Sequence, residues 1–307
     1  MEIRAVDSGH LSGIRAITHA TGQSDEDSGA DPAYVEVIRA QGHAKVAVSG
    51  GTVLGWAGAL PTPLGTLLTD LFVDPAVHAR GVGAALLRAL PPLEFTFSSK
   101  HPSALPLYAR AGMVPSWPLL YLSGPVSRLP RGVLRVDRVD ATTAASTEAA
   151  LSPVGGADPN AVSGAVVGRG AGAGMGSGVA ADLGAGAGLG PGRDGGGRAA
   201  VYRHWMRAGR AFVVRDGERV TAVGAGRPGV PGVLAHLTCS DPRSAAGALY
   251  AAVAALDSDH VALCLPGPHP ALRTLLAAGF RVDDFDLSMQ APTIELPPTW
   301  SYAPGLA

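Results

Sequence analysis

A glycine-containing loop, Arg80-Gly81-Val82-Gly83, stands directly before a strong helix-forming run at 84–90. The run before the loop, 67–73, is apolar and β-branched and predicts a strand, which Asp74-Pro75 ends. A helix N-terminus offers backbone N–H groups without intrahelical partners and a partial positive charge, and glycine lets an anion approach closely. The spacing therefore predicts a site for a phosphate or pyrophosphate.

The same loop also fits an ordinary strand-to-helix turn whose glycines serve tight packing. It is not a P-loop, because no Gly-Lys-Ser/Thr sequence ends it. It is not a dinucleotide fingerprint either, because a third glycine and a following acid are missing at the required distances.

A second segment follows the next predicted strand, 93–98. It reads His101-Pro102-Ser103-Ala104-Leu105-Pro106-Leu107-Tyr108-Ala109-Arg110-Ala111-Gly112-Met113. With His78-Ala79-Arg80-Gly81-Val82-Gly83, it resembles the two most diagnostic motifs of the GNAT superfamily of acyl-CoA-dependent N-acetyltransferases. These motifs are Arg/Gln-x-x-Gly-x-Gly/Ala and Asn-x-x-Ala-x-x-Leu-Tyr-x-x-x-Gly-Phe. Histidine replaces Arg/Gln in the first and Asn in the second, but the glycines and the tyrosine remain. The resemblance covers roughly 3–122.

The predicted elements that surround these motifs follow the GNAT order. They are a strand at 3–6, helices at 8–20 and 32–41, a hairpin of 45–48 with 53–60, and a last strand at 114–122. The resemblance implies an α/β (α+β) fold with a mixed central sheet flanked by helices. It also implies that two central strands separate after the glycine loop and leave a slot for pantetheine.

The resemblance assigns roles to residues of both motifs. Tyr108 is expected to protonate the departing coenzyme A sulfur, although a tyrosine that only packs one helix face is the alternative. The strand edge at Phe72 and Val73 is expected to pair with the pantetheine amide. The cofactor-binding loop is expected to consist of His78, Arg80, Gly81, Val82, Gly83 and Ala84.

Asp70 is the first candidate for the base that deprotonates an amine, since it lies on the strand that enters the loop. Several GNAT enzymes acting on amines read Leu-Glu-Asp-Leu-Phe-Val here, and Thr69 replaces the glutamate in this chain. Ser98, Ser99 and His101 are the alternatives. His101 has a suitable pKa, but a structural histidine that caps the next helix fits equally well.

Acidic residues in the loop 21–31 provide a further candidate feature. In a GNAT-like fold this loop borders the acceptor site, so Asp25-Glu26-Asp27 could attract a cationic amine. The alternative is a solvated loop whose acids cap helices.

The length of 307 residues favours two domains. We expect a catalytic GNAT-like domain at 1–128 and a linker at 129–199, which contains a Gly/Ala-rich stretch at 155–197 expected to be flexible. A degenerate GNAT-like domain at 200–295, with its own mixed sheet, and a tail at 296–307 follow. Asp74 recurs as Asp241 and Gly112 as Gly279 at one constant offset, but the glycine loop does not recur and Leu275 replaces Tyr108.

Composition excludes several function classes. A net charge of −1 gives no footprint for nucleic acid or an anionic membrane surface. The beginning of the sequence does not resemble a signal peptide, and no stretch is apolar enough to span a bilayer. Cys239 and Cys264 stand in apolar runs away from other ligands, which indicates core thiols in a reducing cytoplasm and neither a disulfide nor a metal site.

These observations predict a cytoplasmic N-acetyltransferase, monomeric or homodimeric, that transfers an acetyl group from acetyl-CoA to a primary amine of a small molecule, without a metal. The alternative is a non-catalytic acyl-CoA-binding sensor or interaction protein. Tyr108, Gly81 and Gly83 favour the enzyme because all three motif positions are kept in one half.

Overall fold

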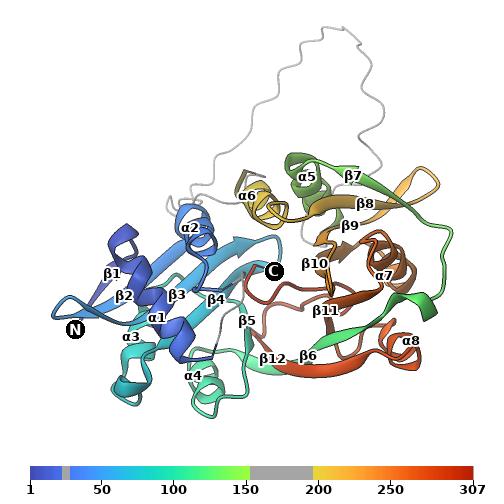
Figure 1. Cartoon of the computed structure of the whole chain (residues 1–307). Coiled ribbons are helices and arrows are strands. Elements are labelled where there is room, and N and C mark those ends of the chain that lie inside the picture. The colour runs from blue at the N-terminus through green and yellow to red at the C-terminus, as the bar shows by residue number, and fades with distance from the viewer. Residues whose placement is uncertain (23–27, 153–195, 307) are drawn as a thin grey trace, which may run out of the picture.

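The computed structural model describes residues 1–22, 28–152 and 196–306. Within these ranges, twelve strands form one continuous mixed sheet that is flanked by helices (Figure 1). This confirms the expected mixed α/β architecture, and it joins the two expected sheets edge to edge. No helix of the described part is both long and apolar enough to cross a membrane.

The first half contains the elements that carry both sequence motifs. They are β1 (Glu2–Ala5), η1 (Ser8–His10), α1 (Leu11–Ala20), α2 (Pro32–Gln41), β2 (His43–Ser49), β3 (Thr52–Thr62), β4 (Gly65–Val73), η2 (Pro75–Val77), α3 (Val82–Arg88), β5 (Phe95–Ser98), α4 (Ala104–Arg110), β6 (Val114–Pro125) and η3 (Val126–Arg128).

The second half repeats this succession. Its elements are β7 (Arg135–Val139), α5 (Ala141–Leu151), α6 (Gly196–Trp205), β8 (Arg210–Asp216), β9 (Arg219–Arg227), β10 (Gly232–Cys239), α7 (Ala245–Ala254), β11 (His260–Pro266), α8 (Leu272–Ala277) and β12 (Arg281–Gln290). The strand order in the sheet is β1-β2-β3-β4-β5-β12-β6-β11-β10-β9-β8-β7.

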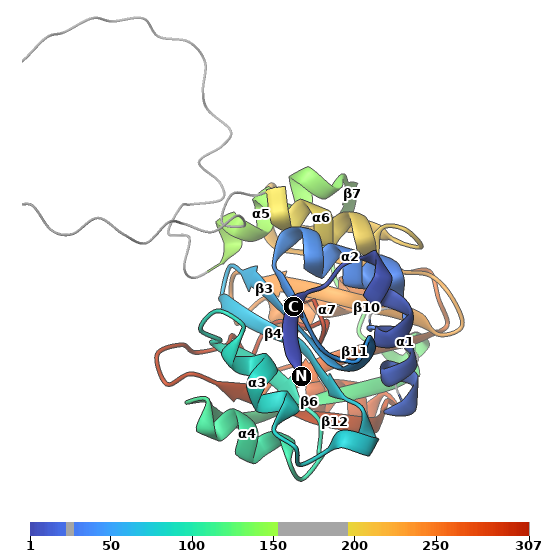
Figure 2. The same ribbon diagram turned by 90° about the vertical axis from the view of Figure 1, so that its left-hand side faces the viewer.

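Residues of β3 alternate between two helical layers. Trp56 is fully buried in a cluster with Tyr34 of α2, whereas Ala57 belongs to a cluster with Leu86 of α3 and Tyr108 of α4. Because successive side chains of a strand point to opposite faces, α2 covers one face of this part of the sheet, and α3 and α4 cover the other. Helix α6 of the second half packs beside α2 (Figure 2).

The two halves exchange their last strands. Strand β12 lies between β5 and β6 of the first half, and β6 lies between β12 and β11 of the second. Arg281 pairs with Ser123, and Val114 pairs with Gln290. The offset that relates Asp74 to Asp241 also relates Val114 to Arg281 and Ser123 to Gln290. The two pairs are therefore equivalent, and a pseudo-twofold axis passes between β6 and β12.

Two segments expected to lie outside the domains belong to the fold. Strand β7 and helix α5 lie within 129–199, yet β7 pairs with β8 along its whole length and α5 packs on β9. In the expected tail, Trp300, Ser301 and Tyr302 are buried. Short strands and Ala-rich helices gain their stability from such tertiary contacts, which local periodicity does not reveal. Residues 153–195 of the expected linker lie outside the described residues.

Candidate active site

Strands β4 and β5 separate at the glycine loop, as the resemblance implies. They pair at Leu67 and Phe95, and Thr96 Oγ1 donates to the carbonyl of Leu68 at 3.0 Å. Toward the carboxyl ends, no further ladder pair joins the described residues of the two strands. A gap therefore opens between β4 and β5, beside the beginning of α3.

The loop before α3 has the backbone conformation that a glycine favours. Gly81 has φ of 80° and precedes the first helical residue, and Ala79 is also left-handed, with φ of 62°. The first hydrogen bond of the helix runs from the N–H of Ala85 to Gly81. Consequently, the N–H groups of 82–84 have no intrahelical acceptor and can bind an anion.

The side chain of His78 contacts the strand edge that was expected to receive pantetheine. Its Nε2 donates to the carbonyl of Val73 at 2.9 Å, and its ring lies edge-on to that of His101 at 5.7 Å. Phe72 stacks on Trp56 with ring centroids 6.4 Å apart. His78 therefore links the loop to β4 through a hydrogen bond, and the carbonyl oxygen of Val73 already accepts this bond.

Tyr108 lies on α4 and is only 7% exposed. Burial, and then the charges of Asp70 and Asp286, raise the pKa of Tyr108 well above its usual value. The phenol therefore keeps its proton at neutral pH and can serve as a donor.

Asp70 is equally buried, at 7% exposure, on β4. Tyr34 of α2 donates a hydrogen bond to Asp70 Oδ2 at 2.6 Å, and the same hydroxyl lies 3.2 Å from the carbonyl oxygen of Gly305. Burial raises the pKa of Asp70 to about 7 although the Tyr34 hydrogen bond lowers it. A carboxylate with this pKa can exchange a proton near neutral pH.

The alternative bases lie elsewhere. His101 is exposed, and its Nδ1 accepts from the backbone N–H of Ser103 at 3.3 Å, which fits the helix-capping alternative. Ser98 is buried and donates to the carbonyl of Ser99 at 3.0 Å. Of the predicted acid–base residues, Asp70 and Tyr108 lie on opposite faces of the sheet but near enough for the charge of Asp70 to raise the pKa of Tyr108. Asp25-Glu26-Asp27 lie outside the described residues.

Three residues of this site were not expected from the sequence. Tyr34 is an apolar-face residue of α2, and its partner Asp70 is distant in the chain. Asp286 and Tyr121 meet because β12 is inserted beside β5, and Tyr121 Oη donates to Asp286 Oδ2 at 2.7 Å. The only signal in the sequence is an acidic residue within the apolar end of β12.

The corresponding gap in the second half is filled by the chain itself. Leu237 of β10, at the position of Asp70, exchanges backbone hydrogen bonds of 3.0 and 2.9 Å with Ser301. The N–H of Tyr302 donates to the carbonyl of Cys264 on β11 at 3.3 Å, and Ser301 Oγ donates to the same oxygen at 3.0 Å. The C-terminal segment thus joins β10 through a single antiparallel bridge and β11 through hydrogen bonds to Cys264, beyond the part where these two strands pair with each other.

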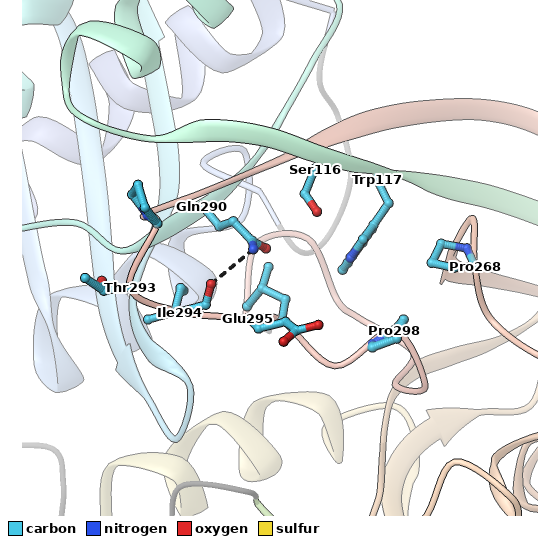
Figure 3. A pocket seen from close by; sticks show the side chains of 10 residues that line it. Ser116, Trp117, Pro268, Gln290, Thr293, Ile294, Glu295 and Pro298 are labelled. Carbon is cyan, nitrogen blue, oxygen red and sulfur yellow. Dashed lines mark hydrogen bonds between the residues drawn. The ribbon is translucent and has the colours of Figure 1, made fainter.

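A cavity of about 610 Å³ lies apart from these residues (Figure 3). It is bordered by Trp117 of β6, by Pro268 and by the chain after β12, where Gln290 Nε2 donates to the carbonyl of Ile294 at 3.1 Å. None of the predicted site residues lines it.

Cys239 and Cys264 form no disulfide with each other; Cys239 is buried and Cys264 partly buried. Among the described residues, no group of three or more His, Cys, Asp or Glu side chains is arranged to hold a metal ion.

Comparison with known proteins supports the interpretation of the first half. Residues 14–91 match the model of the acetyltransferase (GNAT) family. No curated protein matches the chain.

Solved structures share the fold over nearly the whole chain. A proposed acetyltransferase from Pyrococcus horikoshii is 13% identical with a TM-score of 0.61, covering 98% of this chain and 92% of that one. A tandem GNAT protein from the clavulanic acid biosynthesis pathway is 13% identical with a TM-score of 0.52, covering 96% and 99%. A GCN5-related N-acetyltransferase from Kribbella flavida is 16% identical with a TM-score of 0.51, covering 94% and 70%. Residues 14–91 thus resemble the acetyltransferase (GNAT) family, and the chain as a whole shares its fold with these solved structures.

Proposed function

We propose that the first half transfers an acetyl group from acetyl-CoA to a primary amine of a small molecule. The single observation that carries this proposal is the position of two buried proton-exchanging groups at the gap between β4 and β5. Asp70 contacts α2 on one face of the sheet, and Tyr108 belongs to α4 on the other. A donor and an acceptor that enter from opposite faces would meet between them.

The donor side is formed by the glycine loop and α3. The free N–H groups at 82–84 would bind the pyrophosphate of the coenzyme, and Arg80, which is exposed beside them, would add a positive charge. Since the Val73 carbonyl accepts from His78, the pantetheine arm would use other groups of the β4 edge.

The reaction needs one base and one acid. Asp70, with a pKa near 7, would take the proton of the ammonium, so that the neutral nitrogen attacks the thioester carbon and a C–N bond forms. The C–S bond then breaks, and Tyr108 gives its proton to the departing sulfur. The nitrogen, which is cationic after the attack, loses its second proton to solvent to give the neutral amide, and solvent returns a proton to Tyr108 and removes the proton from Asp70.

The second half would bind no coenzyme. Its gap is closed by Ser301 and Tyr302, and Leu275 replaces the tyrosine of α4. We therefore expect one acetyl-CoA per chain. We assign the second half a structural role, which includes the donation of β12 to the first half.

Replacement of Tyr108 by Phe tests the proposal. We expect kcat for thiol release from acetyl-CoA to fall about a hundredfold, because general acid catalysis contributes on this order, while the Kd of acetyl-CoA stays unchanged at one equivalent per chain. Tyr250→Phe on α7, a buried tyrosine of the second half, is the matched control and should keep full activity. Wild-type protein that binds acetyl-CoA but turns over no amine in a broad panel would support the sensor alternative, and unchanged turnover in Tyr108→Phe would remove that residue from its role.

A further inference from the structure

Strand β12 carries a carboxylate from the second half into the site of the first. Leu287 pairs with Ser98 at the carboxyl end of β5, where the gap opens, and Asp286 is the next residue outward. Asp286 is partly buried, and the hydrogen bond from Tyr121 Oη fixes its Oδ2. Strands β12 and β6 together therefore fix the position of this carboxylate.

Asp286 and Asp70 lie on the same face of the sheet. Leu287 and Leu71 both pack in the cluster that contains Tyr108. Because successive side chains of a strand point to opposite faces, the residues before them, Asp286 and Asp70, both point to the other face. On that face Asp70 meets Tyr34 of α2. The two carboxylates thus flank the gap from β4 and from β12, on the side opposite the glycine-loop helix.

Neither carboxylate has an ion-pair partner among the described residues. No described Lys, Arg or His forms an ion pair with Asp70 or Asp286, and the nearby Lys100 pairs with Asp284 and lies over the Phe285 ring at 4.8 Å. Burial is the main cause that raises the pKa of both carboxyl groups. The charge of Lys100 lowers the pKa of Asp286 only as a minor effect, so two partly desolvated carboxylates without a direct ion-pair partner create a negative potential that favours a cation.

A third polar group lies on the same face of β12. Ser288 alternates with Leu287 and is fully buried, and its Oγ has no hydrogen-bond partner among the described residues. Burial of a polar group without a partner is unfavourable, so this face of β12 is more polar than sheet packing requires.

We propose that the acceptor carries two basic nitrogens, one deprotonated beside Asp70 and the other held as a cation by Asp286. This inference rests on the proposed function and names the class of acceptor. It also assigns Asp286 as a specificity-determining residue that the second half supplies to the first.

Matched pairs of amines test this assignment in the full-length protein. The probes are α,ω-diaminoalkanes of three to six carbons and the monoamines of the same length, with acetyl-CoA saturating. We expect kcat/KM to be about tenfold higher for the best diamine than for its monoamine, because a hydrogen bond between charged groups contributes on this order. Asp286→Asn should remove the advantage by raising KM for the diamine about tenfold, with a much smaller effect on KM for the monoamine.

Asp284→Asn is the control, because Asp284 lies on the same strand but is exposed and paired with Lys100. It should leave both amines unaffected. Equal rates for diamines and monoamines, or an equal effect of Asp286→Asn on both, would overturn the inference while leaving the proposed function intact. Acetyl-CoA binding without turnover of any amine would instead contradict the proposed function.

Discussion

Each half of the molecule buries a carboxylate on the face that α2 and α6 share, and the two have opposite surroundings. Asp70 of the first half accepts a hydrogen bond from a neutral tyrosine, and burial raises its pKa to about 7. Glu148 of α5 is fully buried as well, but Arg198 of α6 binds both its oxygens at 2.6 and 2.9 Å, and His236 donates to it at 2.8 Å. Burial raises the pKa of Glu148, yet the charges of Arg198 and His236 outweigh this and lower it well below its usual range.

This difference shows how one fold can hold a carboxyl group with a pKa of about 7 in one copy and a permanently charged one in the other. Arg198 also donates to the carbonyl of Leu306 at 2.7 Å, so the ion pair of the second half holds the segment whose residues Ser301 and Tyr302 close the gap. The second half thus uses its buried charge for structure, whereas the first half leaves Asp70 without a cation and hence able to bind one.

The largest effect is expected on stability, from replacing Glu148, whose charge serves the fold. Glu148→Gln leaves Arg198 buried without its counter-ion, so the free energy of unfolding should fall by about 3–5 kcal/mol. Replacement of both Glu148 and Arg198 by Met should restore part of this loss, since no unpaired charge remains. Urea denaturation at pH 7 measures both variants. A loss below about 1 kcal/mol in Glu148→Gln, the range of exposed ion pairs, would contradict the comparison.

Asp70→Asn should act on catalysis. We expect kcat to fall about a hundredfold, together with loss of the rise in kcat/KM through pH 7 that follows deprotonation of the wild-type carboxyl.

The raised pKa of Asp70 also affects stability. Because the folded pKa lies above the unfolded value, the native state keeps a proton that the unfolded chain has released, and the free energy of unfolding declines as pH rises from about 4 to 7.

In Asp70→Asn this decline should be smaller. Denaturation at pH 5 and pH 8, beside a pH–rate profile, measures both consequences. An unaltered profile with an unaltered pH dependence of stability would show that Asp70 does not titrate as the structure indicates.

The smallest effect is expected for Tyr34→Phe. The hydrogen bond from Tyr34 lowers the pKa of Asp70, so its loss should move the rise in kcat/KM upward by about one pH unit and reduce the rate at pH 7 severalfold, while the plateau at high pH stays close to wild type. A pH–rate profile with a parallel thermal melt separates this shift from misfolding. A uniform loss at every pH would indicate a purely structural role.

The sequence predicts the parts of the site that are local in the chain. The glycine loop, the strand before it and the helix of Tyr108 each lie within a short segment whose residue types determine the backbone, so 67–90 and 104–110 were predictable as elements. Asp70 was predictable as a candidate because it stands on the strand that enters the loop.

Other parts depend on which distant segments pair, and local patterns carry no such information. Tyr34 reads as a core residue of α2 until Asp70 lies against it. The insertion of β12 between β5 and β6, which brings in Asp286, and the return of Ser301 to β10 are both pairings between segments far apart in sequence. The low-complexity stretch led us to include β7 and α5 in the expected linker. Strand β7 is short, and α5 is rich in small residues, which give little periodic signal.

The exchanged strands bear on how such a chain could have arisen by duplication. A polypeptide with one half alone would leave an open position between β5 and β6. Two identical copies related by a twofold axis would fill both positions by exchanging their last strands. The present chain has the topology of such a pair fused end to end, through the short connection from η3 to β7. After fusion each copy can change separately, while its final strand continues to complete the sheet of the other.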